Sequence, residues 1–213
     1  MTKKSKLNII LPIAFTAALL ASMIYCGEFA SSGSMFKSVL QLSAIYMLLA
    51  VSLNLLNGFT GLFSLGQAGF MTIGAYTYAI FTIPVKSRAS VYYLYGVADW
   101  LKNIELPVII ALIVAGLAAA LLAAIIGAPV LRLKSDYLAI ATLGFAEVVR
   151  IVVASSPLNK ITNGSLGLKK IPGFESYYGI FIVAFVCIAI IMLLLNSTYG
   201  RALKAIRDDE IAA

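Results

Sequence analysis

Residues 54–83, NLLNGFTGLFSLGQAGFMTIGAYTYAIFTI, form a long uncharged stretch that decides which class of protein this is. The stretch is apolar enough for a membrane, yet glycines and polar side chains interrupt it. Read at helical spacing, one face carries only small residues, namely Gly61, Ser64, Ala68, Thr72, Ala75 and Ala79. Such a face lets another backbone approach closely, and its hydroxyls can form hydrogen bonds across the contact. The stretch therefore predicts a tightly packed transmembrane segment, either for packing alone or also beside a polar pathway.

The composition indicates that most of the chain lies in lipid. Of the 213 residues, 62% are hydrophobic and only 12% are charged, about half the charged fraction of a soluble domain. The apolar runs are continuous rather than alternating, which excludes a membrane β-barrel. Because backbone polar groups must be satisfied within a bilayer, the remaining option is helices. The predicted fold is all-α, a polytopic transmembrane helical bundle.

Six membrane spans are predicted within a single transmembrane domain of residues 1–213. They cover residues 9–26, 39–56, 59–83, 108–131, 137–154 and 177–195, and a cytoplasmic segment follows at 197–213. Whether residues 59–83 form one continuous helix stays open, because repeated glycines weaken helical preference. A short surface helix is expected in the loop between the third and fourth spans.

The orientation of these spans depends on the two ends of the chain. Lysines precede the first span, and the bulky residues before Cys26 do not form a cleavage site, so an uncleaved helix is favoured over a signal peptide. The other basic residues divide almost equally between the two sides, so their distribution does not set the orientation. We expect the N-terminus and the last segment to be cytoplasmic.

Several kinds of site are excluded by residue type. The net charge is +7, but its basic residues are dispersed and form no nucleic-acid patch. The chain contains no histidine, which excludes His-based zinc sites and His-dependent nucleophilic catalysis. Cys26 and Cys187 are interpreted as apolar fillers. Residues 61–68 have the glycine spacing of a phosphate-binding loop, but Gln67 and Ala68 replace its Lys and its Ser or Thr. We expect no metal, no bound ATP and no enzymatic activity in this chain.

Small residues also recur every fourth position in the fourth span, which predicts close helix packing. The candidate packing residues of the third and fourth spans are Gly61, Ala68, Gly69, Ala111, Ala115, Ala119, Ala123 and Gly127.

Polar residues within the spans are the candidates for a translocation pathway: Asn57, Ser64, Gln67, Thr72, Glu147 and Arg150. Glu147 and Arg150 lie three residues apart, on one helical face. A charge near the bilayer centre costs about 3 kcal/mol on insertion scales. The pair is therefore either an intrahelical ion pair near the interface or a charged part of a pathway or helix contact.

The final segment changes character, because basic residues alternate there with apolar ones and acids follow. This pattern predicts an amphipathic helix after the last span. Residues 200–213, GRALKAIRDDEIAA, resemble the cytoplasmic coupling segment of ABC-importer permeases.

Three further segments resemble the branched-chain amino acid permease family, in that family's order and spacing. They are LLNGFTGLFSLGQAGFMTIGAY at 55–76, SDYLAIATLGFAEVVRI at 135–151 and TNGSLGLKKIPGF at 162–174. The second of these segments and the long N-terminus favour the leucine/isoleucine/valine M-type subunit.

The resemblance implies a permease subunit of an ATP-driven importer of branched-chain (hydrophobic) amino acids in a bacterial inner membrane. The implied partners are a second permease chain, two cytoplasmic ATPases that bind ATP and magnesium, and an external substrate-binding protein. The implied ATPase-docking positions are Gly200, Arg201, Lys204, Arg207, Asp208, Glu210, Ala212 and Ala213. The family continues beyond this motif, so the resemblance also implies further helices and an apparent C-terminal truncation, in a shortened gene product or a fragment.

Two alternatives remain. A permease of the same family could carry another small polar solute, such as urea or a short amide. An ion-coupled secondary transporter would need acids near the middle of the membrane and an internal repeat. Only Glu147 meets the first condition, and Arg150 lies beside it.

Overall fold

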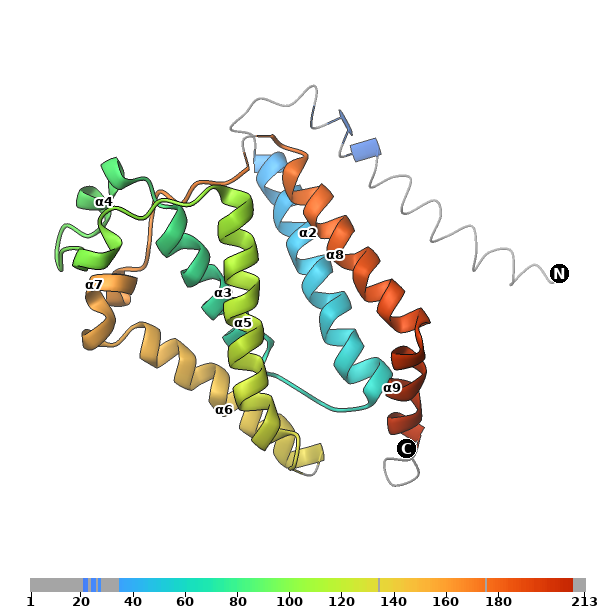
Figure 1. Ribbon diagram of the computed structural model, residues 1–213. Helices are drawn as coiled ribbons and strands as arrows, with labels where there is room; N and C mark the ends of the chain where they lie inside the picture. Colours follow the sequence, from blue (N-terminus) through green and yellow to red (C-terminus); the bar gives the residue numbers. More distant parts are fainter. Residues whose placement is uncertain are drawn as a thin grey trace. The chain divides into compact units, whose positions relative to one another are not determined.

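The computed structural model describes residues 21, 22, 24, 25, 27, 35–133, 135–174 and 176–208, with Ser135, Asp136 and Asp208 in backbone only. Every regular element among these residues is a helix, which confirms the all-α prediction (Figure 1). Most of the first predicted span, and with it Cys26, lies outside the described residues, as do Glu210, Ala212 and Ala213.

The chain divides into two compact units. The smaller one comprises Met1–Val51 and Glu175–Leu193, and the larger one Ser52–Phe174 and Leu194–Ala213. The smaller unit holds most of α2 (Met35–Asn54) and of α8 (Gly179–Asn196), which carries the half-buried thiol of Cys187. At the start of α2, Lys37 lies over the ring of Tyr177, with 5.3 Å between the ammonium nitrogen and the ring centroid. This contact ties the beginning of α2 to the residues just before α8.

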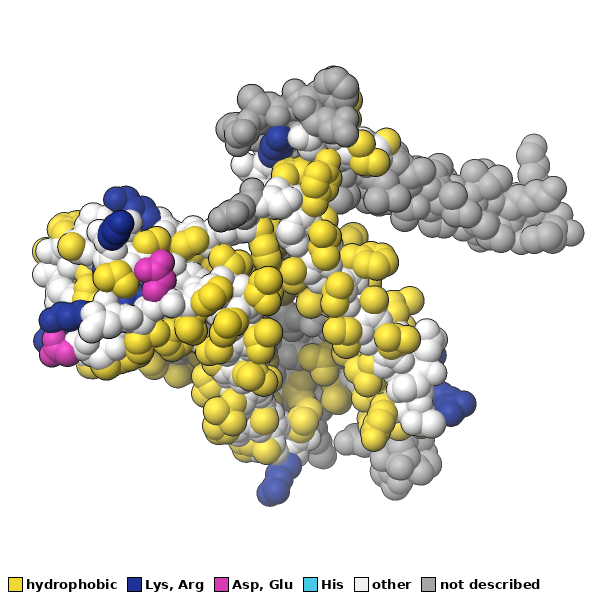
Figure 2. Space-filling view, turned by 45° about the horizontal axis from the view of Figure 1, so that its top comes forward, with side chains coloured by type: hydrophobic (Ala, Val, Ile, Leu, Met, Phe, Trp, Pro, Cys, Tyr) yellow, Lys and Arg dark blue, Asp and Glu magenta, His cyan; other side chains and the backbone are white. Residues whose placement is uncertain are grey.

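Among the residues that the structure describes, three helical stretches are long and apolar enough to cross a membrane. They are Met35–Thr60, Val108–Val130 and Gly179–Asn196. Two bent pairs raise the number to five if each is one span: Gln67–Thr82 with Val85–Val91, bent by 120°, and Tyr137–Val153 with Ser156–Thr162, bent by 54°. Figure 2 shows hydrophobic side chains covering the helices, with charged side chains gathered near helix ends. The chain is therefore a multi-pass membrane protein.

In the larger unit, α3 (Gln67–Thr82) packs against α5 (Val108–Val130) and α6 (Ser135–Val153). A Cβ atom at Gly69 would lie 3.0 Å from Ala146 Cα, so only glycine fits this approach without a shift. On α5, Ala111 and Ala115 are buried. Of the other packing candidates, Ala119, Ala123 and Gly127 are half-buried and Ala68 is exposed. The tight contact of α3 with α6 is therefore made by Gly69 and not by Ala68.

The stretch at 54–83 is a broken helix, which answers the question that the sequence left open. After α2, a π-helix η1 (Leu55–Thr60) leads to Gly61, whose φ of 71° lies in the left-handed region. Residues 61–65 are irregular, and α3 begins only at Gln67. The small helical face predicted from Gly61 to Ala79 is therefore wrong for Gly61 and Ser64. Because L side chains disfavour the left-handed conformation, a glycine is suited to end the helix here. Residues 55–66 are called the break below.

Short helices follow α3 and α6 and form a second irregular region, called the cap below (residues 84–106 and 155–174). It contains α4 (Val85–Val91), η2 (Asp99–Leu101), η3 (Ser156–Leu158), α7 (Asn159–Thr162) and η4 (Gly164–Leu166). The expected surface helix corresponds to α4. The hydrophobic core of the cap consists of Val91 and Tyr92 together with Ile83, which directly precedes the cap. Val97 and Leu168 pack against these residues. In the segment 162–174, Asn163, Gly164 and Gly167 all have positive φ, which accounts for the turn residues there.

Candidate functional site

Neutral side chains satisfy the backbone of the break. Asn57 Oδ1 accepts a hydrogen bond from Ser64 N at 3.1 Å, and Thr60 Oγ1 donates to the Leu56 carbonyl at 2.5 Å. From α6, Thr142 Oγ1 accepts from Leu65 N at 3.0 Å. These bonds replace the partners that a continuous helix would supply. The irregular segment is thus stable without a buried charge.

The structure brings together only some of the predicted pathway residues. Asn57 and buried Ser64 meet inside the break. Gln67 lies at the start of α3 and donates from Nε2 to Ser52 Oγ at 2.8 Å. Thr72 donates to a carbonyl of its own helix, that of Ala68. A pathway role for these residues stays a prediction.

Glu147 and Arg150 form a two-point ion pair along α6. Arg150 Nη2 lies 2.5 Å from Glu147 Oε1, and Arg150 Nε donates to Oε2 at 2.9 Å. The side chains are 53% exposed for Glu147 and 70% for Arg150, so the pair lies on an open face of the helix. Mutual neutralisation lowers the cost of placing both charges in an apolar helix.

The last described helix, α9 (Thr198–Asp208), packs against η1 at the break (Figure 1). Arg207 Nη1 donates to the Gly58 carbonyl at 3.2 Å. Lys204 Nζ lies 5.5 Å from the centroid of the Phe59 ring, in a cation–π contact. A Cβ atom on Gly61 would come within 2.8 Å of Arg207 Cγ. The amphipathic segment and the break therefore form one site.

Within this site the predicted ATPase-docking positions have different environments. Gly200 is buried in the first turn of α9, where an added Cβ would meet the Leu195 carbonyl oxygen. Arg201 is exposed, together with Ala202 and Ala205, while Leu203 and Ile206 are half-buried. The open face of α9 is thus centred on Arg201, and Lys204 and Arg207 contact the chain's own break.

A buried arginine in the cap was missed by the sequence reasoning. Arg88 is only 3% exposed, and its guanidinium donates to the carbonyls of Ile83, Leu101 and Ile104. Its neighbour Tyr92 donates to the Ile161 carbonyl at 2.6 Å, and burial raises the pKa of Tyr92 to about 12, so its hydroxyl keeps its proton at neutral pH. The signal was present, because Arg88 shares a helix face with Val91 and Tyr92.

Comparison with known proteins identifies the family. Residues 35–213 match the sequence profile of a family described as "Branched-chain amino acid transport system / permease component". The chain belongs to this family. It is 32% identical over 232 aligned positions to the high-affinity branched-chain amino acid transport system permease protein LivM of Escherichia coli K12, and 31% identical to LivM of Salmonella typhimurium LT2. Each alignment covers 93% of this chain and 49% of the relative.

The chain thus spans about half the length of the curated relatives it matches. No solved structure matches it. The resemblance inferred from four sequence segments is confirmed at the level of the family. Among the described residues, no group of three His, Cys, Asp or Glu side chains could hold a metal ion.

Proposed function

We propose that this chain is a permease subunit of an ATP-driven importer of branched-chain amino acids, and that α9 is the helix on which an ATPase acts. The observation that supports the proposal best is the contact of α9 with the break, through Arg207 with Gly58 and Lys204 with Phe59. A force on α9 would reach a weakly structured point of the membrane domain directly.

The break is also suited to pass that movement on. Leu65 N donates to Thr142 on α6, so the break is tied to a second helix as well as to α9. Its hydrogen bonds join neutral groups, each contributing about 1 kcal/mol, so they can be exchanged at modest cost. Neutral donors and acceptors also suit the passage of a zwitterion, because they form no deep charge trap.

The proposed assembly contains this chain, a second homologous permease subunit, two cytoplasmic ATPases and an external substrate-binding protein. ATP and magnesium are bound by the ATPases, and no cofactor by this chain. The assembly lies in the bacterial inner membrane, with the N-terminus and α9 on the cytoplasmic side. The open face of α9 around Arg201 is the surface offered to the ATPase.

Charge reversal on α9 tests the proposal. We expect Arg201→Glu to reduce co-purification of the transporter's ATPases and ATP-dependent leucine uptake by about tenfold or more. The new carboxylate would repel the acidic groups of the ATPase that an arginine attracts. Lys86→Glu, at an exposed position of α4, makes the same charge change and serves as the matched control. Arg207→Glu with Glu210→Arg extends the test along the segment.

Association and uptake that are unchanged in Arg201→Glu would contradict the docking role. Competition for uptake separates the substrate classes, since excess urea leaves leucine uptake intact if the substrate is a branched-chain amino acid.

A further inference from the structure

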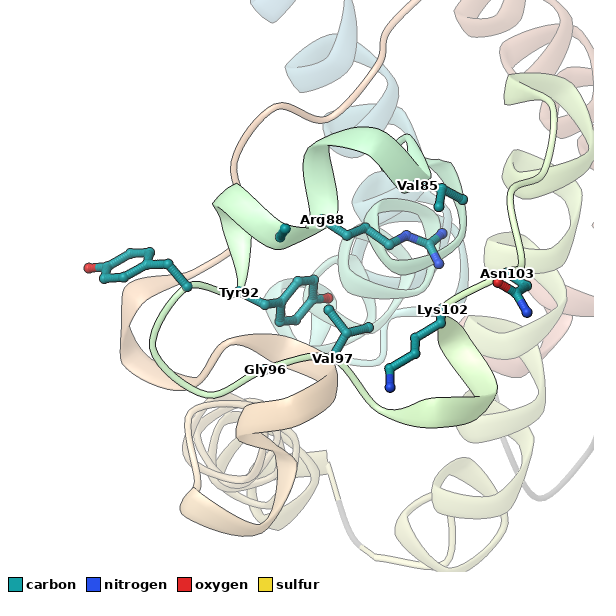
Figure 3. A pocket seen from close by; sticks show the side chains of 9 residues that line it. Val85, Arg88, Tyr92, Gly96, Val97, Lys102 and Asn103 are labelled. Atoms are coloured by element: carbon teal, nitrogen blue, oxygen red, sulfur yellow. The ribbon is translucent and has the colours of Figure 1, made fainter.

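The cap contains a hollow of about 510 Å³ beside Arg88 (Figure 3). Its polar lining is Arg88, Lys102 and Asn103, and its apolar lining includes Val85, Ala89 and Val97. Figure 3 shows the Arg88 side chain running along α4, with its guanidinium toward Val85 and Asn103. The Tyr92 ring lies on the side of Val97, away from the guanidinium. The volume falls within the range of about 300–1,000 Å³ that is usual for small-molecule sites.

The charge of Arg88 has no acidic counterpart in the described part of the chain. The three groups that it is seen to contact are carbonyls. Neither acid of the cap pairs with Arg88, since Asp99 pairs with Lys102 at 2.6 Å and Glu105 Oε2 accepts from Val85 N at 3.1 Å. Lys102 and Val85 both line the hollow. A charge that is buried without an opposite charge is costly, and an anion in the hollow would relieve that cost.

The guanidinium also has capacity for a ligand. It carries five N–H donors in a planar fork, and three of its hydrogen bonds go to the carbonyls of Ile83, Leu101 and Ile104. The cap as a whole has six basic residues against two acidic ones, so an anion is attracted to this end of the molecule. The apolar residues opposite the fork fit a short aliphatic chain.

We infer that this hollow is a binding site for a small aliphatic carboxylate, held by Arg88 with Asn103 beside it and its hydrocarbon part against Val85, Ala89 and Val97. The site lies in the cap, apart from α9 and the break, and it does not depend on the proposed transport function. A purely structural role, in which Arg88 only holds three loop carbonyls, explains its three hydrogen bonds. It does not explain why the hollow beside Arg88 has both polar and apolar walls.

Ligand analogues give a direct test on the purified chain in lipid nanodiscs. The two probes are 4-methylpentanoate, which is leucine without its amine, and 3-methylbutylamine, which is leucine without its carboxylate. Binding is followed by saturation-transfer NMR and by the fluorescence of Trp100, the single tryptophan, two residues from Lys102. We expect 4-methylpentanoate to bind at least about tenfold more tightly than 3-methylbutylamine, because only the former pairs with Arg88. Equal binding of the two probes, or no binding of either, would overturn the site.

Two variants locate the binding in the hollow. Asn103→Asp adds a carboxylate to the lining while leaving the three carbonyl bonds of Arg88 in place. We expect it to weaken 4-methylpentanoate binding by about tenfold through like-charge repulsion. Lys86→Gln makes the same change in net charge outside the lining and should stay within about twofold. If both variants bind the carboxylate like the parent chain, the hollow is not the site.

Discussion

The break and the cap lie at opposite ends of α3, and they are held together by different means. In the break, Asn57, Thr60 and Thr142 supply neutral hydrogen bonds that each satisfy one or two backbone groups. In the cap, the single guanidinium of Arg88 joins two segments through three carbonyls, that of Ile83 after α3 and those of Leu101 and Ile104 in one turn. Separate weak hydrogen bonds can be exchanged one at a time, whereas the three hydrogen bonds of one buried guanidinium are lost together if its side chain moves. We therefore expect the break to move during function and the cap to stay rigid.

Arg88→Met gives the largest expected effect. It leaves three loop carbonyls without their donor, at about 1–3 kcal/mol for each buried acceptor, and should reduce the free energy of unfolding by about 3–5 kcal/mol, with the loss centred on the cap. Denaturant unfolding of the purified chain measures the total, and hydrogen exchange of the cap amides shows its location.

Lys86→Met removes a charge of the same sign from an exposed position of α4 and should change the free energy of unfolding by less than about 0.5 kcal/mol. If Arg88→Met is as mild as this control, the cap does not depend on its arginine.

Gly61→Ala tests the break at its tightest point. The residue has φ of 71°, and an added Cβ would lie 2.8 Å from Arg207 Cγ. We expect a loss of about 1–2 kcal/mol from the left-handed backbone alone, together with faster hydrogen exchange in α9, because Arg207 must move.

The matched control is Gly116→Ala, in the exposed part of α5, where nothing lies within 4 Å of the added Cβ. Alanine favours a helix interior by about 1 kcal/mol over glycine, so this variant should be neutral or stabilising. The same loss in both variants would mean that Gly61 is not a special position.

The sequence predicted the elements whose signals are local. The fourth span was expected at 108–131 and α5 covers Val108–Val130, because Pro107 precedes a run of apolar residues with strong helical preference. The break was only half predicted. The second span was predicted to end at residue 56, but the decision for a broken helix depends on Thr142, which lies 77 residues from its partner Leu65.

The site depends even more on distant contacts. Arg207 and Gly58 are 149 residues apart, and nothing in the two residue types predicts that they form a hydrogen bond. The resemblance of residues 200–213 to a coupling segment predicts an ATPase-docking role for α9, but it could not indicate that two of its cations face the chain's own η1. Arg88 was overlooked because a mixed-charge loop usually lies in solvent. Its burial requires three carbonyls that only the folded cap brings together.

Thr142→Val measures the tie between the break and α6. The substitution keeps the shape of the side chain but leaves Leu65 N without its acceptor, which should cost about 1–2 kcal/mol. Thr72→Val is the matched control, since the Thr72 hydroxyl donates only to the Ala68 carbonyl of its own helix. We expect Thr142→Val to accelerate hydrogen exchange at residues 62–66 and Thr72→Val to leave it unchanged. Equal exchange in the two variants would show that the hydrogen bond from α6 does not hold the break.

The smallest expected effect concerns the contact between Lys204 and Phe59. An exposed cation–π pair contributes about 0.5–1 kcal/mol, so Lys204→Met should weaken the docking of α9 on η1 by that amount. Because Lys204 is also a candidate for ATPase docking, the single variant confounds two roles. A double-mutant cycle with Phe59→Leu separates them, since only the intramolecular contact couples the two residues. A coupling energy near zero would mean that Lys204 is held to the break only by the packing of its neighbours, and its charge would then be available to the ATPase.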